Sequence, residues 1–185
     1  MHILGIPGSL RKQSYNRGLL RAAEKVLPEG VTFEVFDLEG IPPFNQDKEK
    51  EPAPRVTELK ARIRAAGAIV IATPEYNYSV PGVLKNALDC ASRPYGDNAW
   101  DDKPLAIMGA SVGAIGTARA QYHLRQMSVF LNMHPMNSPE VMVSNAATRF
   151  DAEGNLTDQE SIDRIRKLLA ALASWARRLG NPLIG

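Results

Sequence analysis

The chain has 185 residues, of which 44% are hydrophobic and 23% are charged, a composition typical of a globular protein that buries a sizeable core. Its formal net charge of +2, without a long run of Lys or Arg, argues against a nucleic-acid-binding protein. No apolar stretch approaches the ~18 residues of a membrane span. The first apolar run stops at Pro7-Gly8, too early for a signal peptide.

A single cysteine, Cys90, excludes an intrachain disulfide bond. It lies in an apolar helical pattern, where a buried small hydrophobe is expected rather than a reactive thiol. No repeat, low-complexity stretch or linker divides the chain. We therefore expect one soluble domain, residues 1–185, in the reducing environment of the cytoplasm.

The first part of the chain alternates between strand and helix patterns. Residues 2–6 are a short apolar run that predicts a buried strand, and residues 16–27 carry apolar side chains at helical spacing. Residues 31–38 alternate apolar and polar side chains, as in a half-exposed strand near a sheet edge. A loop rich in proline and charge, residues 40–54, leads to a helix predicted over 55–66.

The middle of the chain repeats this alternation with more apolar strands. Residues 68–73 (AIVIAT) indicate a central parallel strand that is covered on both faces. The next helix is predicted over residues 81–92, with Pro81 in its first turn. Another apolar strand over 105–109 precedes a helix over 117–131.

The last strand is predicted over residues 133–136, over 140–143, or over both. A long amphipathic helix over 157–179 follows, closed by Gly180 and Pro182. Five strands alternating with five helices predict a parallel sheet with helices on both faces. The fold class is therefore α/β, a flavodoxin-like three-layer αβα sandwich whose five-stranded sheet has the order 2-1-3-4-5.

Three polar loops follow the first, third and fourth predicted strands. Loop 1 is residues 8–16 (GSLRKQSYN), loop 2 is residues 74–79 (PEYNYS) and loop 3 is residues 110–116 (ASVGAIG). In a parallel sheet of this order, ligands bind beyond the carboxyl ends of the strands, where the strand order switches. The three loops are therefore expected to form one polar site at this edge.

The composition of loop 1 favours a phosphate monoester. Hydroxyls and an arginine stand where a helix begins, and helix starts present unpaired N–H groups and a positive dipole end. The loop lacks the G-x-x-x-x-G-K-[ST] of nucleoside-triphosphate sites and the G-x-G-x-x-G of dinucleotide sites. The acidic residues that a phosphorylation-switch receiver needs after strands 1 and 3 are missing. A plain polar loop with a Ser/Asn helix cap is the alternative.

Loops 2 and 3 suggest a planar ring beside this phosphate. Tyr76 and Tyr78 can flank a ring, although loop packing or an oligomer contact would also explain them. Pro74 restricts the backbone so that the following N–H groups can point outward, toward the edge of a flavin ring. In loop 3, Gly113 allows close backbone approach and Ser111 can donate a hydrogen bond.

At these residues the sequence resembles the NADPH-dependent FMN reductase family, and within it the quinone, chromate and azo reductases. The resemblance spans nearly the whole chain, and PEYNYSVPGVLKNALD (74–89) is its most specific part. It implies that loop 1 holds the FMN phosphate and that loop 2 contacts the isoalloxazine ring largely through its backbone. The positions it implies for FMN binding are Ser9, Arg11, Ser14, Tyr15, Asn16, Pro74, Glu75, Tyr76, Asn77, Tyr78, Ala110, Ser111 and Gly113.

The resemblance further implies an FMN-dependent NAD(P)H oxidoreductase with tightly bound, non-covalent FMN. In a ping-pong reaction NAD(P)H passes a hydride to flavin N5, and then quinones, azo or nitro compounds, oxidised metal ions or free flavin take the electrons. No side chain is expected to be catalytic, because the cofactor carries the chemistry. A non-enzymatic flavodoxin-type electron carrier is the alternative, although such carriers tend to be acidic. A flavin-free protein on the same fold is a third.

The family is also implied to form homodimers or homotetramers that act on small-molecule acceptors. Candidate subunit contacts are residues 93–100, where Trp100 would otherwise be exposed, and residues 121–131. His123 and His134 lack a carboxylate or Cys at ligand spacing, so no metal site is expected.

Overall fold

The computed structural model describes residues 1–180, and its centre is a six-stranded sheet in which neighbouring strands run parallel. The strand order is β2-β1-β3-β4-β5, and β6 also pairs with β4. The fold and strand order predicted from the sequence are confirmed, with the last strand divided in two. The strands are β1 (His2–Pro7), β2 (Thr32–Val35), β3 (Ala68–Ala72), β4 (Pro104–Ala110), β5 (His134–Pro135) and β6 (Val141–Val143).

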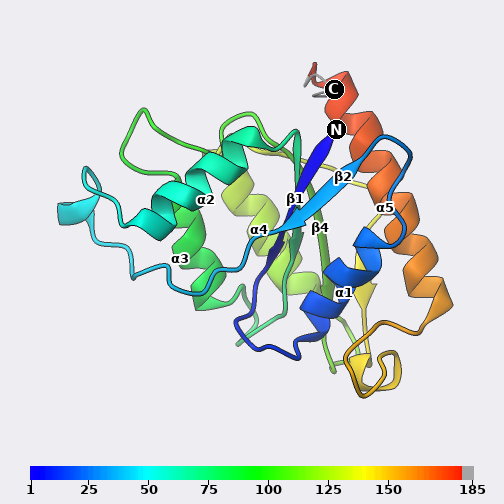
Figure 1. Cartoon of the computed structure of the whole chain (residues 1–185). Helices are drawn as coiled ribbons and strands as arrows, with labels where there is room; N and C mark the ends of the chain where they lie inside the picture. Colours follow the sequence, from blue (N-terminus) through cyan, green and yellow to red (C-terminus); the bar gives the residue numbers. More distant parts are fainter. Residues whose placement is uncertain (181–185) are drawn as a thin grey trace.

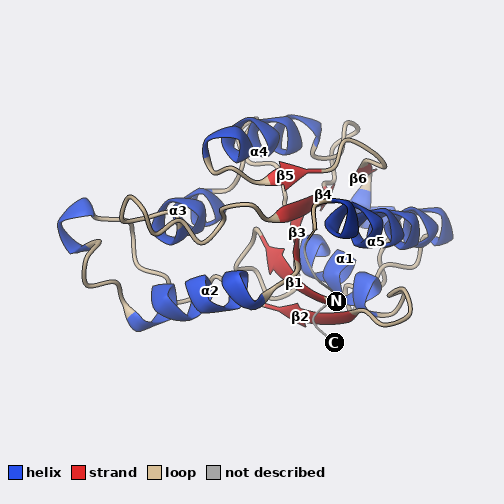
Figure 2. Cartoon of the chain, turned by 90° about the horizontal axis from the view of Figure 1, so that it is seen from above, coloured by secondary structure: helices blue, strands red, loops and turns tan. Residues whose placement is uncertain are grey.

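Helices cover both faces of the sheet (Figure 1). The view from above shows α2, α3 and α4 on one side and α1 and α5 on the other (Figure 2). The α-helices are α1 (Tyr15–Glu24), α2 (Pro54–Ala65), α3 (Gly82–Ala91), α4 (Ala118–Phe130) and α5 (Gln159–Arg178), and two short 3-10 helices are η1 (Gln46–Lys48) and η2 (Ala146–Thr148). Each layer of helices closes a separate hydrophobic cluster against the sheet.

Burial along each strand explains its place in the sheet. Every residue of β3 and β4 is buried, because helices cover both faces of these central strands. No residue of β2 is fully buried, which agrees with its predicted place at an edge. Both candidate segments for the last strand pair with β4, each over two or three residues.

Helix boundaries differ from the prediction by a few residues where capping decides them. Ser14 accepts the Asn16 N–H, so α1 begins at Tyr15, and it ends at Glu24, before the predicted Leu27. Pro81 is the N-cap of α3 and lies outside its first turn. Gly180 follows α5 with φ of +75°, as expected for a helix stop, whereas Pro182 lies outside the described residues.

The prediction for Trp100 was wrong. Its side chain is fully buried in the cluster beneath α2, α3 and α4, and its indole N–H donates to the Leu88 carbonyl at 3.1 Å. Trp100 is therefore a core residue and is removed from the candidate oligomer contacts. Large aromatic surface drives such burial once the indole N–H has a partner.

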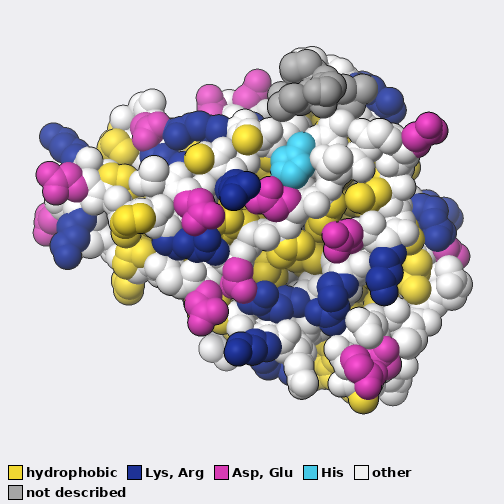
Figure 3. Space-filling view, viewed as in Figure 1, with side chains coloured by type: hydrophobic (Ala, Val, Ile, Leu, Met, Phe, Trp, Pro, Cys, Tyr) yellow, Lys and Arg dark blue, Asp and Glu magenta, His cyan; other side chains and the backbone are white. Residues whose placement is uncertain are grey.

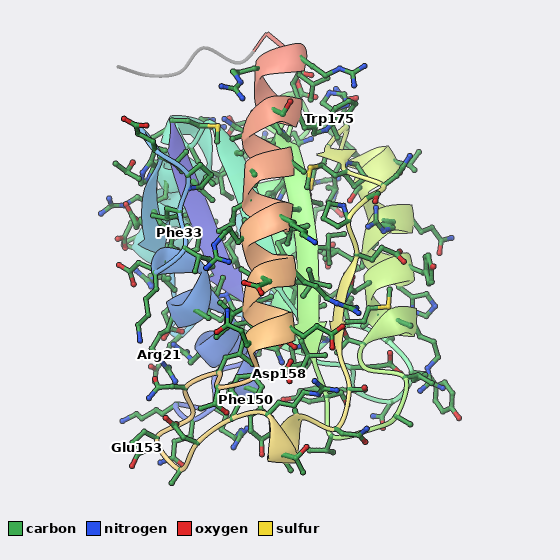
Figure 4. All side chains as sticks on the ribbon, turned by 90° about the vertical axis from the view of Figure 1, so that its right-hand side faces the viewer. Arg21, Phe33, Phe150, Glu153, Asp158 and Trp175 are labelled. Carbon is green, nitrogen blue, oxygen red and sulfur yellow. The ribbon has the colours of Figure 1, made fainter. Side chains whose placement is uncertain are left out.

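The hairpin of residues 150–156 supports the start of α1 from below. Figure 4 shows Phe150 and Asp158 near the lower end of α5, with Arg21 and Glu153 further to the left. Phe150 packs on the Tyr15 ring, with 4.9 Å between centroids, and Arg21 donates to the Gly154 carbonyl at 2.6 Å. This hairpin holds the helix that follows loop 1.

Candidate functional site

Loops 1, 2 and 3 follow β1, β3 and β4, and because these strands are parallel neighbours, the loops open at the same sheet edge, low in Figure 1. The strand order reverses at β1, which has β2 on one side and β3 on the other. Basic side chains gather low on the molecule over loop 1 and α1 (Figure 3). The predicted switch-point edge therefore carries the three loops together.

Loop 1 presents donors around a capped helix start. The hydroxyls of Ser9 and Ser14 are each 3% exposed by residue and accept the N–H groups of Arg11 and Asn16, at 3.3 and 3.2 Å. Arg11 is exposed, and its guanidinium lies 5.4 Å from the centre of the Tyr15 ring. The first N–H groups of a helix have no acceptor within the helix. Together with Arg11, they provide the donors that a terminal phosphate needs.

Loop 2 is a tight turn with two tyrosines. Tyr76 and Ser79 exchange backbone hydrogen bonds at 3.0 Å each, and Asn77 and Tyr78 have positive φ of 49° and 65°, as in a type I′ turn. Tyr76 is 50% exposed and Tyr78 is 68% exposed. The Tyr76 hydroxyl lies 3.4 Å from the Ser9 hydroxyl, which joins loop 2 to loop 1.

Glu75 faces α4 rather than the open edge. Its carboxylate accepts the backbone N–H groups of Arg119 and Ala120, at 3.0 and 3.2 Å, and the Arg119 Nε–H at 2.5 Å. A carboxylate at a helix start is favoured by the helix dipole. Glu75 thus anchors loop 2 through its side chain, which leaves only its backbone for the ring contact that the resemblance implies.

Sequence reasoning missed Arg119. Its guanidinium stacks on the Tyr78 ring at 3.5 Å from the centroid, while its Nε–H binds Glu75. The sequence could have placed Arg119 at this edge, because it follows loop 3 in the first turn of the next helix. Nothing in the local sequence, however, indicates its contact with a tyrosine 41 residues earlier in the chain.

The histidines have ordinary partners. His123 Nδ1 lies 2.9 Å from the Ser79 hydroxyl, and His134 Nε2 lies 2.5 Å from the Asp102 carboxylate. Within residues 1–180, no group of three or more His, Cys, Asp or Glu side chains is placed to hold a metal ion.

Loop 3 is tied to both β6 and α1. The Ser111 N–H donates to the Val143 carbonyl at 3.0 Å, and the Ser111 hydroxyl accepts the Gly113 N–H at 3.2 Å. The Asn16 carboxamide, which is on α1, binds both the N–H and the carbonyl of Ala110. Hydrogen bonds therefore connect loop 1 to each of the other two loops, as the predicted common site requires.

A cavity also lies away from the three loops. It has a volume of about 830 Å³ between the 42–53 segment and the end of α3, with Phe44, Val56 and Cys90 among its walls. Cys90 is 7% exposed, as predicted, and burial together with nearby Asp89 raises the pKa of its thiol. A neutral thiol in an apolar wall is unreactive at neutral pH.

The residues at the switch-point edge fit FMN. A helix start, two seryl oxygens and Arg11 match a phosphate monoester. The N–H groups of Asn77 and Tyr78 have no protein acceptor among residues 1–180, so they can reach the polar edge of a ring. Exposed tyrosine surface beside them suits a flat aromatic group.

Comparisons with known proteins agree with this geometry. The family model for NADPH-dependent FMN reductase matches residues 1–148. An NAD(P)H-dependent FMN reductase of Pseudomonas aeruginosa is 52% identical, over 96% of this chain and 96% of that protein. A 2-hydroxy-1,4-benzoquinone reductase of a Burkholderia species is 41% identical, over 96% of this chain and 97% of that protein. The structure of a flavoenzyme NAD(P)H:acceptor oxidoreductase of Paracoccus denitrificans superposes with a TM-score of 0.87 at 34% identity, covering 96% of this chain and 97% of that one. The chain therefore belongs to the NADPH-dependent FMN reductase family, as the loop motifs predict, and is an oxidoreductase.

Proposed function

We propose that this protein transfers electrons from NAD(P)H, through FMN, to quinones and related small acceptors. The observation that carries the proposal is the meeting of three polar loops at one sheet edge, with phosphate-type donors in loop 1 and an exposed tyrosine turn in loop 2. Family membership and the quinone reductases among the relatives support it.

The protein's own part is to bind and orient. Arg11 and the start of α1 would hold the phosphate, and the buried hydroxyls of Ser9 and Ser14 shape the turn that would surround it. When bound, FMN supplies hydride acceptance and two-electron release. The N–H groups of Asn77 and Tyr78 would donate to the ring, and such donors would favour additional negative charge on it.

The open edge would admit a broad range of acceptors. Tyr76, Asn77 and Tyr78 are exposed, so the ring face would stay accessible to successive flat molecules. This arrangement suits a ping-pong sequence in which the nicotinamide leaves before the acceptor enters the same place.

Steady-state kinetics of the FMN-loaded protein test the proposal. Rates are measured with NADH and NADPH against a benzoquinone, an azo dye and ferricyanide, each at several fixed concentrations of the other substrate. Parallel double-reciprocal lines with the benzoquinone are expected. Intersecting lines would disprove the ping-pong sequence, and FMN binding without NAD(P)H oxidation would favour the electron carrier. A protein with no affinity for FMN would overturn the proposal.

We also propose a homodimer or homotetramer in the cytoplasm. On α4, Val129 is 82% exposed, Phe130 is 79% exposed and Tyr122 is 54% exposed. Exposed apolar side chains that gather in this way are typical of a protein–protein interface. The free thiol of Cys90 suits a reducing compartment. No helix within residues 1–180 is long and apolar enough to cross a membrane. Sedimentation equilibrium tests the assembly, with Val129→Lys expected to shift the mass toward the monomer.

A further inference from the structure

The carboxamide of Asn16 occupies a place where the sheet lacks a strand. β3 and β4 pair in register up to Ala72 opposite Met108, and the Thr73 N–H still donates to the Met108 carbonyl at 2.9 Å. Two residues further, the register would set Pro74 opposite Ala110. Proline has no N–H to donate, and the chain turns away there into loop 2. The β3 side of Ala110 is therefore left without a strand neighbour.

Asn16 supplies the missing hydrogen bonds. Its Nδ2–H donates to the Ala110 carbonyl at 3.0 Å, and its Oδ1 accepts the Ala110 N–H at 2.9 Å. The N–H and carbonyl of one strand residue point to the same side, and the Ser111 N–H already donates to β6 on the opposite side. A carboxamide is the side chain that can both donate to and accept from one backbone residue. Turning it over would place oxygen against oxygen.

This bridge determines how loop 1 stands relative to loop 3. Asn16 is the second residue of α1 and is 2% exposed, so its contact with Ala110 is shielded from water. Its own N–H is taken by the Ser14 hydroxyl at 3.2 Å. The Asn16 side chain faces the end of β4, where the Ala110 N–H and carbonyl take up one acceptor and one donor of its carboxamide.

We propose that Asn16 is a positioning residue that joins the phosphate-binding turn to loop 3, rather than a ligand of the phosphate. This inference rests on the proposed FMN site. It makes a distinct claim: loss of the bridge disturbs the whole cofactor site, including the part that never touches phosphate. Riboflavin, which has the ring but no phosphate, separates the two roles.

The test measures binding of FMN and of riboflavin to the apoprotein by quenching of flavin fluorescence. For Asn16→Ala, affinity for both flavins is expected to fall by a similar factor, about tenfold or more. For Arg11→Ala, affinity for FMN alone is expected to fall, which provides the matched control. A loss for Asn16→Ala that is confined to FMN would overturn the inference, because it would identify Asn16 as a phosphate ligand.

A second variant, measured while it is fully folded, separates a loss of stability from a loss of positioning. Asn16→Leu has a similar shape but can neither donate to the Ala110 carbonyl nor accept its N–H, and it adds no charge that would repel the FMN phosphate. It is measured well below its own melting temperature, and the same parallel loss for both flavins is expected. Unchanged affinity for both flavins in a folded variant would also overturn the inference. Wild-type protein that binds neither flavin would instead disprove the proposed function.

Discussion

The switch-point edge and the cavity beside α3 differ in their shape and in the chemistry of the groups that line them. The cavity has a volume of about 830 Å³ and mostly apolar walls, and two of its charged side chains, Arg93 and Glu49, pair with each other at 2.8 Å. In the left part of Figure 3, apolar side chains gather over this region. At the edge, by contrast, backbone and side-chain donors from three loops meet.

The difference teaches that the proposed FMN site is distinguished by convergent hydrogen-bond donors rather than by the volume of a cavity. Flat, exposed sites can bind tightly where a charged group and several oriented N–H groups act together. The cavity, by contrast, arises where a proline-rich segment stands off the body of the molecule (Figure 2). Four variants can break or sharpen this contrast.

The largest effect is expected for Gly109→Ala, in the strand below the edge. A Cβ on Gly109 would collide with the Thr117 hydroxyl and the Thr73 carbonyl, both closely packed. Overpacking against backbone should lower the free energy of unfolding by about 3 kcal/mol. Urea denaturation measures it, with Gly82→Ala as the control, because a Cβ on Gly82 meets nothing within 4 Å. Equal stability of the two variants would show that the edge is not tightly packed.

Arg11→Ala should weaken FMN binding by about 1–3 kcal/mol, the value of a charge-assisted phosphate contact. The effect should fade as salt is added, since the side chain is exposed. Fluorescence titration measures it, and Arg62→Ala, on α2, serves as the control. If the affinities of Arg11→Ala and wild type agree, Arg11 does not belong to the site.

Glu75→Gln should cost about 1 kcal/mol of stability, because the amide keeps one acceptor for the α4 N–H groups but loses the ion pair with Arg119. We expect a smaller loss of FMN affinity than for Arg11→Ala. Thermal unfolding with and without FMN measures both effects, and a variant as stable as wild type would contradict the anchoring role.

The smallest effect is expected for Cys90→Ser, on the cavity side. Turnover should be unchanged, because the thiol lies away from the loops. In the wild type, burial raises the Cys90 pKa, so the thiolate fraction at neutral pH is below that of a free cysteine. Labelling by a disulfide reagent should therefore be slow at pH 7 and quicken as pH rises. Fast labelling at pH 7, or loss of turnover with FMN still bound, would show that the thiol is reactive.

Local patterns in the sequence were sufficient for the architecture. The all-apolar run of β3 and the alternating pattern of β2 predicted a central and an edge strand, because strand burial depends on which faces are covered. The three loop motifs predicted their common edge, since parallel strands end on the same side. Helix ends were less predictable, because hydrogen bonds such as the Ser14 cap decide them.

Contacts between distant segments were decided by the tertiary structure alone. Glu75 with Arg119, Asn16 with Ala110 and the burial of Trp100 join residues that no local periodicity relates. The sequence by itself determined the alternation of elements, the family motifs and the edge where the loops meet. Which polar side chains face a ligand and which complete the protein's own hydrogen bonds was decided only on folding, because buried donors and acceptors must find partners wherever the packed chain supplies them.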